Sequence, residues 1–157
     1  RMVLDVYLVE LRDNRRLRSN ERTRTLDQGF VFTEQAPERI DCHYLISAWS
    51  PAQLAPGIEP TLDELALLDD AAAALIRTAP LTPSRLYPAA SAKLAAWPER
   101  FRDDEIPATV LPIEGFPKLS EFWTTMGQGS PWKPAVYLVV TLRVALVREP
   151  AGPMVTP

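Results

Sequence analysis

AVYLVVTLRVALV, residues 135–147, is the stretch that decides the fold, because its side chains alternate between two faces over its whole length. Alternation with a period of two is typical of a β-strand. Valine and leucine occupy one face almost alone, and the other face is also mostly apolar. We therefore predict a long strand here, the strongest of the chain.

Two earlier stretches show the same period. RIDCHYLISAW, residues 39–49, alternates cleanly, and VLDVYLVEL, residues 3–11, is apolar on both faces except at Asp5 and Glu10. A strand that is apolar on both faces is usually covered on both sides by packed layers. We therefore predict a strand over each stretch, with residues 3–11 near the middle of the sheet and Leu11 on the same face as its other odd-numbered residues.

Two other stretches have helical spacing. In residues 61–79 apolar side chains recur every three or four positions, and Thr61 with Glu64 has the spacing of a capping box. A shorter apolar stripe covers residues 118–126, and Gly127 follows it in a position suited to closing a helix. We predict one long helix and one short helix.

The remaining stretches are less regular. Residues 12–25 predict a polar arm, irregular or hairpin-like, and residues 30–33 predict a short strand. Residues 106–113 contain two prolines, which place a short strand at a sheet edge. Long strands interspersed with two helices indicate an α+β (mixed α/β) fold, with one central sheet and helices packed against it. We expect a single domain over residues 1–147 and a tail or linker over residues 148–157.

The composition argues against several classes of protein. A chain of 157 residues with 46% hydrophobic residues is long enough to bury one core. Its net charge of −3 argues against nucleic-acid binding, which requires a surplus of lysine and arginine. No apolar run approaches the ~20 residues that span a bilayer, and no signal-peptide pattern opens the sequence. We expect no nucleic-acid or membrane partner, and synthesis in the cytoplasm, where the single cysteine stays reduced.

Residues with catalytic potential are few. The only cysteine, Cys42, and the only histidine, His43, are neighbours in a predicted strand, so their side chains point to opposite faces and cannot meet. We interpret His43 as a partly exposed residue of the sheet. The acidic run at residues 103–105 lacks the ligand spacing of a calcium loop, and the six glycines form no phosphate-binding motif. We expect no catalytic residue, no cofactor and no metal.

Charged residues are distributed unevenly along the chain. Residues 11–25 carry six basic and two acidic residues, whereas residues 59–70 carry five acidic residues and no basic one. Complementary patches favour docking between subunits, although ordinary solvated surfaces are an equal alternative. A tryptophan beside a lysine just before the last strand also suits an interface. The candidate partner-contacting residues are Arg12, Arg15, Arg16, Arg18, Arg22, Arg24, Trp132 and Lys133.

Several stretches, taken in order, resemble one known family. They are VYLVELRDNRRLRSN (6–20), RIDCHYLISAWS (39–50), ALIRTAPLTP (74–83), and EFWTTMG (121–127) followed by KPAVYLVVTL (133–142). Their order and spacing over residues 4–146 resemble the cap-protein domain of extracellular contractile injection systems. These are the tail terminators of virulence-cassette and antifeeding-prophage type particles. The helix that the family pattern has before the first strand is absent here, which we interpret as a truncated start, and the linker at residues 127–134 is longer than the pattern.

The resemblance implies a structural protein without an active site. It implies a ring of six subunits on the end of the inner tube and contractile sheath, which fixes tail length in a phage-tail-like particle. Its partners would be further copies of the chain and the sheath and tube proteins. The arginine-rich arm is then the candidate for contact with a neighbouring subunit or the sheath, and a sheath subunit can dock by adding a strand to an exposed sheet edge.

Two other functions stay open from the residues alone. A tail-completion or baseplate protein would show the same lack of catalytic residues. A small enzyme would need a substrate-sized pocket that converges on His43 or on residues 103–105.

Overall fold

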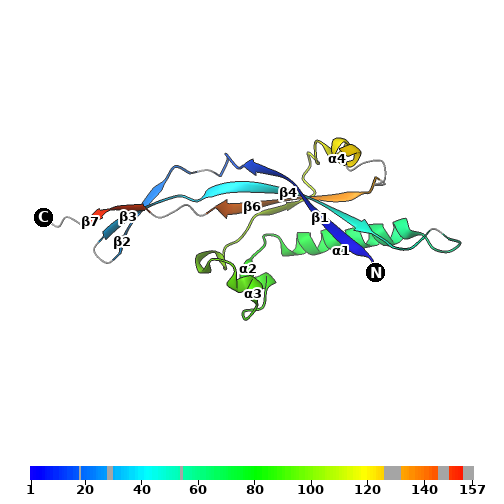
Figure 1. Cartoon of the computed structure of the whole chain (residues 1–157), viewed down its shortest axis with the longest axis horizontal. Helices are drawn as coiled ribbons and strands as arrows, with labels where there is room; N and C mark the ends of the chain where they lie inside the picture. The colour runs from blue at the N-terminus through cyan, green and yellow to red at the C-terminus, as the bar shows by residue number, and fades with distance from the viewer. Residues whose placement is uncertain (18, 28–29, 54, 126–131, 145–148, 154–157) are drawn as a thin grey trace.

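An elongated body with an arm at one end makes up the molecule (Figure 1). The computed structural model describes the whole chain except residues 18, 28–29, 54, 126–131, 145–148 and 154–157. A four-stranded antiparallel sheet with helices forms the body, and a separate three-stranded sheet forms the arm. The body confirms the predicted α+β fold, whereas the second sheet was not predicted.

The sheet of the body has the strand order β1-β4-β6-β5. Its strands are β1 (Val3–Asp13), β4 (Glu38–Trp49), β5 (Ala108–Val110) and β6 (Ala135–Val144). The two inner strands, β4 and β6, pair residue by residue from Glu38 opposite Val144 to Ser47 opposite Ala135. This confirms the strand predicted over residues 39–49. It also confirms the strand predicted over residues 135–147 as far as Val144, and residues 145–147 lie outside the described residues. The short β5 lies at the sheet edge, as its prolines predicted.

The first strand lies at the opposite edge of this sheet, so the prediction that it is near the middle was wrong. Among the strands that the structure describes, β1 pairs only with β4. Val6 is 59% exposed and Leu8 is 51% exposed. An apolar pattern on both faces shows that both faces need cover, but it does not show that the same chain provides it.

One face of the sheet is covered by α1 (Pro60–Thr78). Its residues Leu68 and Ala72 pack with Ile46, Ala48 and apolar residues of β6 in a single core cluster. Because β4 and β6 are apolar on this face and α1 presents one apolar stripe, the core forms where they meet. Asp69 and Asp70, on the outer side of the helix, are exposed.

The predicted capping box at the start of α1 was wrong. The residue that caps the helix is Glu59, Pro60 occupies the first turn, and within the described residues no side chain makes a capping hydrogen bond there. Proline suits this position because it lacks the amide hydrogen that would otherwise stay unpaired. Glu64 cannot reach back to the cap because its carboxylate binds elsewhere.

The other face carries α4 (Leu119–Thr125), which lies on the opposite side of the sheet from α1 (Figure 1). The ring of Phe122 meets Tyr7 of β1 edge to face, with 5.6 Å between ring centroids. Trp123 is buried. The helix predicted over residues 118–126 is confirmed within the described residues, and Gly127 lies outside them.

A small helical lobe connects α1 to β5. It consists of α2 (Pro83–Leu86), α3 (Ala92–Ala95) and the 3-10 turn η1 (Glu99–Phe101). Ser91 accepts a hydrogen bond from the amide of Leu94 and so caps α3. Figure 1 shows this lobe on the same side of the sheet as α1.

The arm is a sheet of order β2-β3-β7. It is built from β2 (Arg22–Asp27), β3 (Phe30–Gln35) and β7 (Glu149–Pro153). β2 and β3 pair in antiparallel fashion, which confirms the strand predicted at residues 30–33. Of the polar stretch predicted over residues 12–25, residues 12–13 belong to β1 and residues 22–25 to β2, so only its end lies in this arm. β7 falls in the stretch expected as a tail or linker, and it pairs with β3, more than 100 positions earlier in the chain.

Removing part of the α1 core contact tests the packing. Leu68→Ala deletes a side chain that is 6% exposed, and we expect it to lower the free energy of unfolding by about 2–5 kcal/mol. Ile76→Ala, at a position of the same helix that is 58% exposed, is the matched control and should change it by less than about 1 kcal/mol. Urea unfolding followed by circular dichroism measures both. Equal losses in the two variants would contradict this packing.

Candidate interaction surfaces

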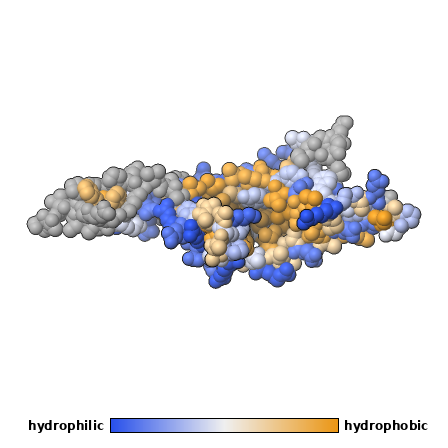
Figure 2. Space-filling view, turned by 60° about the horizontal axis from the view of Figure 1, so that its bottom comes forward, coloured by the Kyte–Doolittle hydropathy of each residue, from blue (hydrophilic) through white to orange (hydrophobic). Residues whose placement is uncertain are grey.

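The outer edge of β1 is open. No strand among the described residues pairs with this side of β1, so the backbone amides and carbonyls of alternate residues face outward along this eleven-residue strand. On the face that Figure 2 shows, apolar surface gathers over the body. An open edge of this length and apolarity is a template for a further strand.

One apolar stripe follows this edge on the side of α1. Leu4 lies opposite Ala48 and Val6 opposite Ile46, so both share the face that α1 covers on the inner strands. A β-bulge between Leu8 and Glu10 shifts the register by one residue and places Leu11 opposite Cys42. Leu11 therefore joins the same face, contrary to the simple alternation predicted from the sequence, and is 59% exposed.

A groove follows the same strand on the side of α4. It has a volume of about 580 Å³ and lies between β1 and α4. Its apolar lining includes Tyr7, Val9, Phe116 and Phe122, and Lys118 lies at its border. The edge of β1 thus offers apolar surface on both faces, as a strand partner with apolar side chains on both of its faces would require.

The arginines of residues 12–25 differ in whether they already form an ion pair within their own chain. Arg12 pairs with Glu10 of its own strand at 2.6 Å, and Arg15 lies 3.7 Å from Asp13. Arg16, Arg22 and Arg24 are exposed and form no ion pair with another described residue. Arg18 lies outside the described residues.

The acidic stretch of α1 forms a second charged surface. Glu59, Asp63, Asp69 and Asp70 are exposed, and none of them pairs with a basic group among the described residues. The start of α1 and the arm lie at opposite ends of the long axis (Figure 1). The two charged surfaces of one molecule therefore cannot meet each other.

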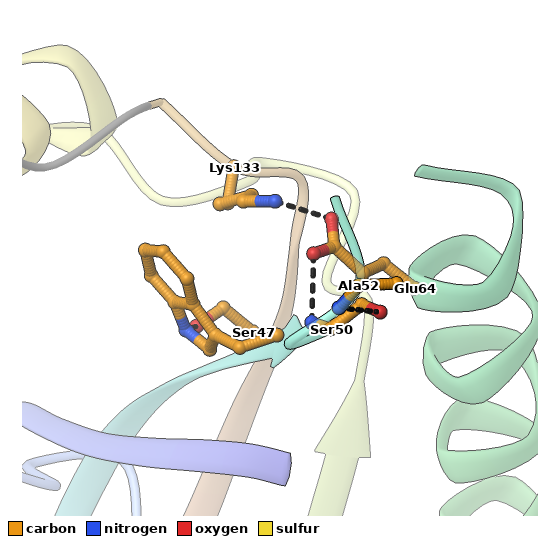
Figure 3. Close-up of polar contacts among 6 residues, drawn as sticks. Ser47, Ser50, Ala52, Glu64 and Lys133 are labelled. Carbon is orange, nitrogen blue, oxygen red and sulfur yellow. Dashed lines mark hydrogen bonds and ion pairs between the residues drawn. The ribbon is translucent and has the colours of Figure 1, made fainter. Parts of the chain in front are cut away.

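The fifth acidic residue of this stretch, Glu64, is buried in a polar cluster. Its carboxylate forms an ion pair with the Lys133 ammonium and accepts a hydrogen bond of 2.9 Å from the Ser50 amide, as drawn in Figure 3. Burial raises the pKa of Glu64, but the hydrogen bonds from Lys133 and Ser50 outweigh it and hold the pKa below its ordinary value. The cluster ties the ends of β4, α1 and the segment before β6 together.

The two residues predicted at the interface before β6 differ in their surroundings. The Lys133 ammonium also lies 5.2 Å from the ring centre of Trp49, and its side chain is only 19% exposed. It is therefore engaged within its own molecule. Trp132 is 67% exposed and stays available to a partner.

His43 is buried, so our interpretation of it as partly exposed was wrong. Its Nδ1 lies 2.5 Å from the Tyr137 hydroxyl, a contact between adjacent strands that local sequence does not reveal. Burial, and then the charge of Arg12, lower the pKa of His43, so the neutral ring is favoured. Cys42 lies on the opposite face, as predicted.

The acidic run at residues 103–105 lies apart from His43. Asp104 forms an ion pair of 2.8 Å with Arg143 at a pocket of about 80 Å³ whose lining does not include His43. Within the described ranges, no group of histidine, cysteine, aspartate and glutamate side chains has the arrangement of a metal site. The same part of the chain has no helix long and apolar enough to cross a membrane.

Comparison with known families decides the relationship. The family described as "Pvc16 N-terminal domain" matches residues 2–156. The chain belongs to this family. None of the curated proteins compared with it is similar enough to count as a match.

Two solved structures have a similar fold. One is the sheath/tube terminator of the extracellular contractile injection system PVC in the extended state, with a TM-score of 0.60, 20% identity, and 99% of this chain covered. The other is the tube-terminating cap of the anti-feeding prophage, with a TM-score of 0.63, 20% identity, and 97% of this chain covered. This member of the Pvc16 N-terminal family spans about half the length of the two solved chains, 48% and 45% respectively.

The buried ion pair gives a direct test of the polar cluster. Glu64→Gln keeps the shape of the side chain but leaves the Lys133 ammonium without its counter-charge, and we expect unfolding to become easier by about 2–3 kcal/mol. Asp70→Asn neutralises an exposed carboxylate of the same helix and should change stability by at most about 0.5 kcal/mol. Thermal and urea unfolding at neutral pH distinguish them, and a Glu64→Gln protein as stable as the unaltered chain would refute the role given to the pair.

Proposed function

We propose that this chain is a structural part of the cap that ends the tail of a contractile injection particle. The observation that carries the proposal is the similarity of nearly the whole fold to two proteins described as a sheath/tube terminator and a tube-terminating cap. Membership of the Pvc16 N-terminal family supports it. The chain would act as part of a ring, six-membered as the family resemblance implies, that fixes tail length.

The distribution of surface features suits assembly better than catalysis. The candidate catalytic groups His43 and Asp104 contact Tyr137 and Arg143, and His43 does not line the pocket at Asp104. The larger features are an open sheet edge, a basic arm and an acidic helix face. Different surfaces at the two ends of one chain allow the head-to-tail contacts that close a ring.

The β1 edge is the proposed docking site for a neighbouring protein of the particle, with a sheath strand as the occupant. A strand added there would satisfy the outward backbone groups and cover Val6 and Leu8 on one face. Its other face would meet the groove lined by Tyr7 and Phe122. This combination of backbone hydrogen bonds and alternating side-chain contacts is the chemistry of strand addition.

Loss of the chain from cells that make the particle tests the function. A terminator sets the point at which tube and sheath stop growing, so we expect tails of widely varied length in electron micrographs of the deletion strain. Resupply of the full chain should restore a narrow length distribution. Gold-labelled chain should lie at the end of the tail away from the baseplate. Labelling at the baseplate would favour the alternative of a baseplate protein. Tails of uniform length in the absence of the chain would overturn the proposal.

A lysine on the open edge tests the docking site. Val6→Lys places a charge where a docked strand would bury it, and we expect sheath co-purification to fall at least about tenfold. Ile113→Lys is the matched control, because Ile113 is fully exposed and follows β5, the strand at the opposite edge of the sheet from β1. Unchanged sheath binding by Val6→Lys, with intact circular dichroism, would exclude the edge as the site.

A further inference from the structure

We infer that the arm of one copy docks on the outward acidic face of α1 in the next copy. The occupant of the acidic face is thus a second copy of this chain. The inference rests on the proposed ring and names the two surfaces that build it.

The charges of the two surfaces are complementary and uncompensated. On the arm, Arg22 and Arg24 are exposed and stand on one face of β2, since side chains two apart in a strand point the same way. On α1, Glu59, Asp63 and Asp70 are exposed and fall on one line, at spacings of four and seven residues. Neither set has an ion-pair partner among the described residues of its own chain.

The spacings of the two sets also match. Side chains two apart in a strand are separated by about 7 Å. Positions four apart in a helix are separated by about 6 Å along its axis. The guanidinium groups of Arg22 and Arg24 can therefore reach Glu59 and Asp63, which are four positions apart, while Asp70 lies about 10 Å further along the helix and extends the acidic line.

An apolar component adjoins the acidic line. Leu62, three positions after Glu59 and therefore beside the acidic line, is 65% exposed. Arginine covers apolar surface with its methylene groups while its guanidinium reaches a carboxylate. An arginine-bearing strand laid along the acidic line would cover Leu62 and form ion pairs with the acids. A strongly anionic partner such as nucleic acid would be repelled by the same face.

The geometry of the chain selects a second copy as the partner. The arm and the start of α1 lie at opposite ends of the molecule, so one chain cannot satisfy its own charges (Figure 1). Every copy supplies one basic and one acidic surface, in equal number. Contacts of this heterologous kind repeat head to tail and close when the rotation between subunits allows it.

Charge reversal on each surface tests the contact in the full chain. The arm variant Arg22→Glu with Arg24→Glu changes the arm face from two positive to two negative charges. The helix variant Asp63→Lys with Asp70→Lys changes the helix line from three negative charges to a net charge of +1. Each variant alone should need at least about tenfold more protein to form rings, measured by light scattering and negative-stain microscopy.

A mixture of the two variants provides the decisive result. The acidic arm of the arm variant can dock on the basic helix of the helix variant. The unaltered basic arm of the helix variant can dock on the unaltered acidic helix of the arm variant. An equimolar mixture should therefore form rings near the protein concentration that the unaltered chain requires. Neither a folding defect nor a general charge effect predicts this rescue. Arg85→Glu with Lys93→Glu, a double reversal in the helical lobe, is the matched control and should assemble normally.

The outcomes separate this contact from the proposed function. Rings from each single variant, or no rescue in the mixture of folded variants, would overturn the arm–helix contact while the cap function stands. Failure of the unaltered chain to form rings, together with normal tail length in its absence, would overturn the proposed function and this contact with it.

Discussion

The ladder between β4 and β6 determines which side chains face α1 and which face α4. Tyr44 lies opposite Leu138 and Ile46 opposite Val136, and these pairs belong to the core under α1. A slip of one residue would exchange the two faces of a strand. Such a slip would place the small and apolar residues that α1 covers on the side of α4, and it would separate His43 from Tyr137. The sides on which α1 and α4 pack therefore follow from this register.

The exposed edge of β1 shows how a sequence carries information about contacts that its own fold does not make. Natural proteins usually protect an edge strand with charge, proline or a short length. β1 is long, and its middle residues are apolar on both faces. Its bulge, moreover, keeps Leu11 on the side of Leu8, which extends one apolar stripe instead of dividing it between the faces. These features are costly in a chain that stays alone and are useful in one that receives a partner.

Elements with strong local periodicity could be predicted from the sequence, and features set by distant residues could not. The strands at residues 39–49 and 135–147 and the helix at residues 61–79 have spacings that only one kind of element satisfies. The capping box failed because Glu64 binds Lys133, which is 69 positions away. The burial of His43 depends on Tyr137, 94 positions away, and the third strand of the arm comes from the far end of the chain.

The same distinction applies to the candidate surfaces. The excess of arginine in residues 12–25 and of acidic residues in residues 59–70 is visible in the sequence. Only the fold shows that the two stretches lie at opposite ends of the molecule, and that Glu64 and Arg12 already form ion pairs within their own chain.

The charged surfaces and the apolar strand edge act over different ranges. Charges attract across about 10 Å at moderate salt and orient an approaching subunit. Strand addition requires direct backbone contact and fixes register. A chain with charged ends and an apolar edge can thus select its own copies by charge and a different partner by strand pairing, because neither interaction satisfies the groups that the other uses.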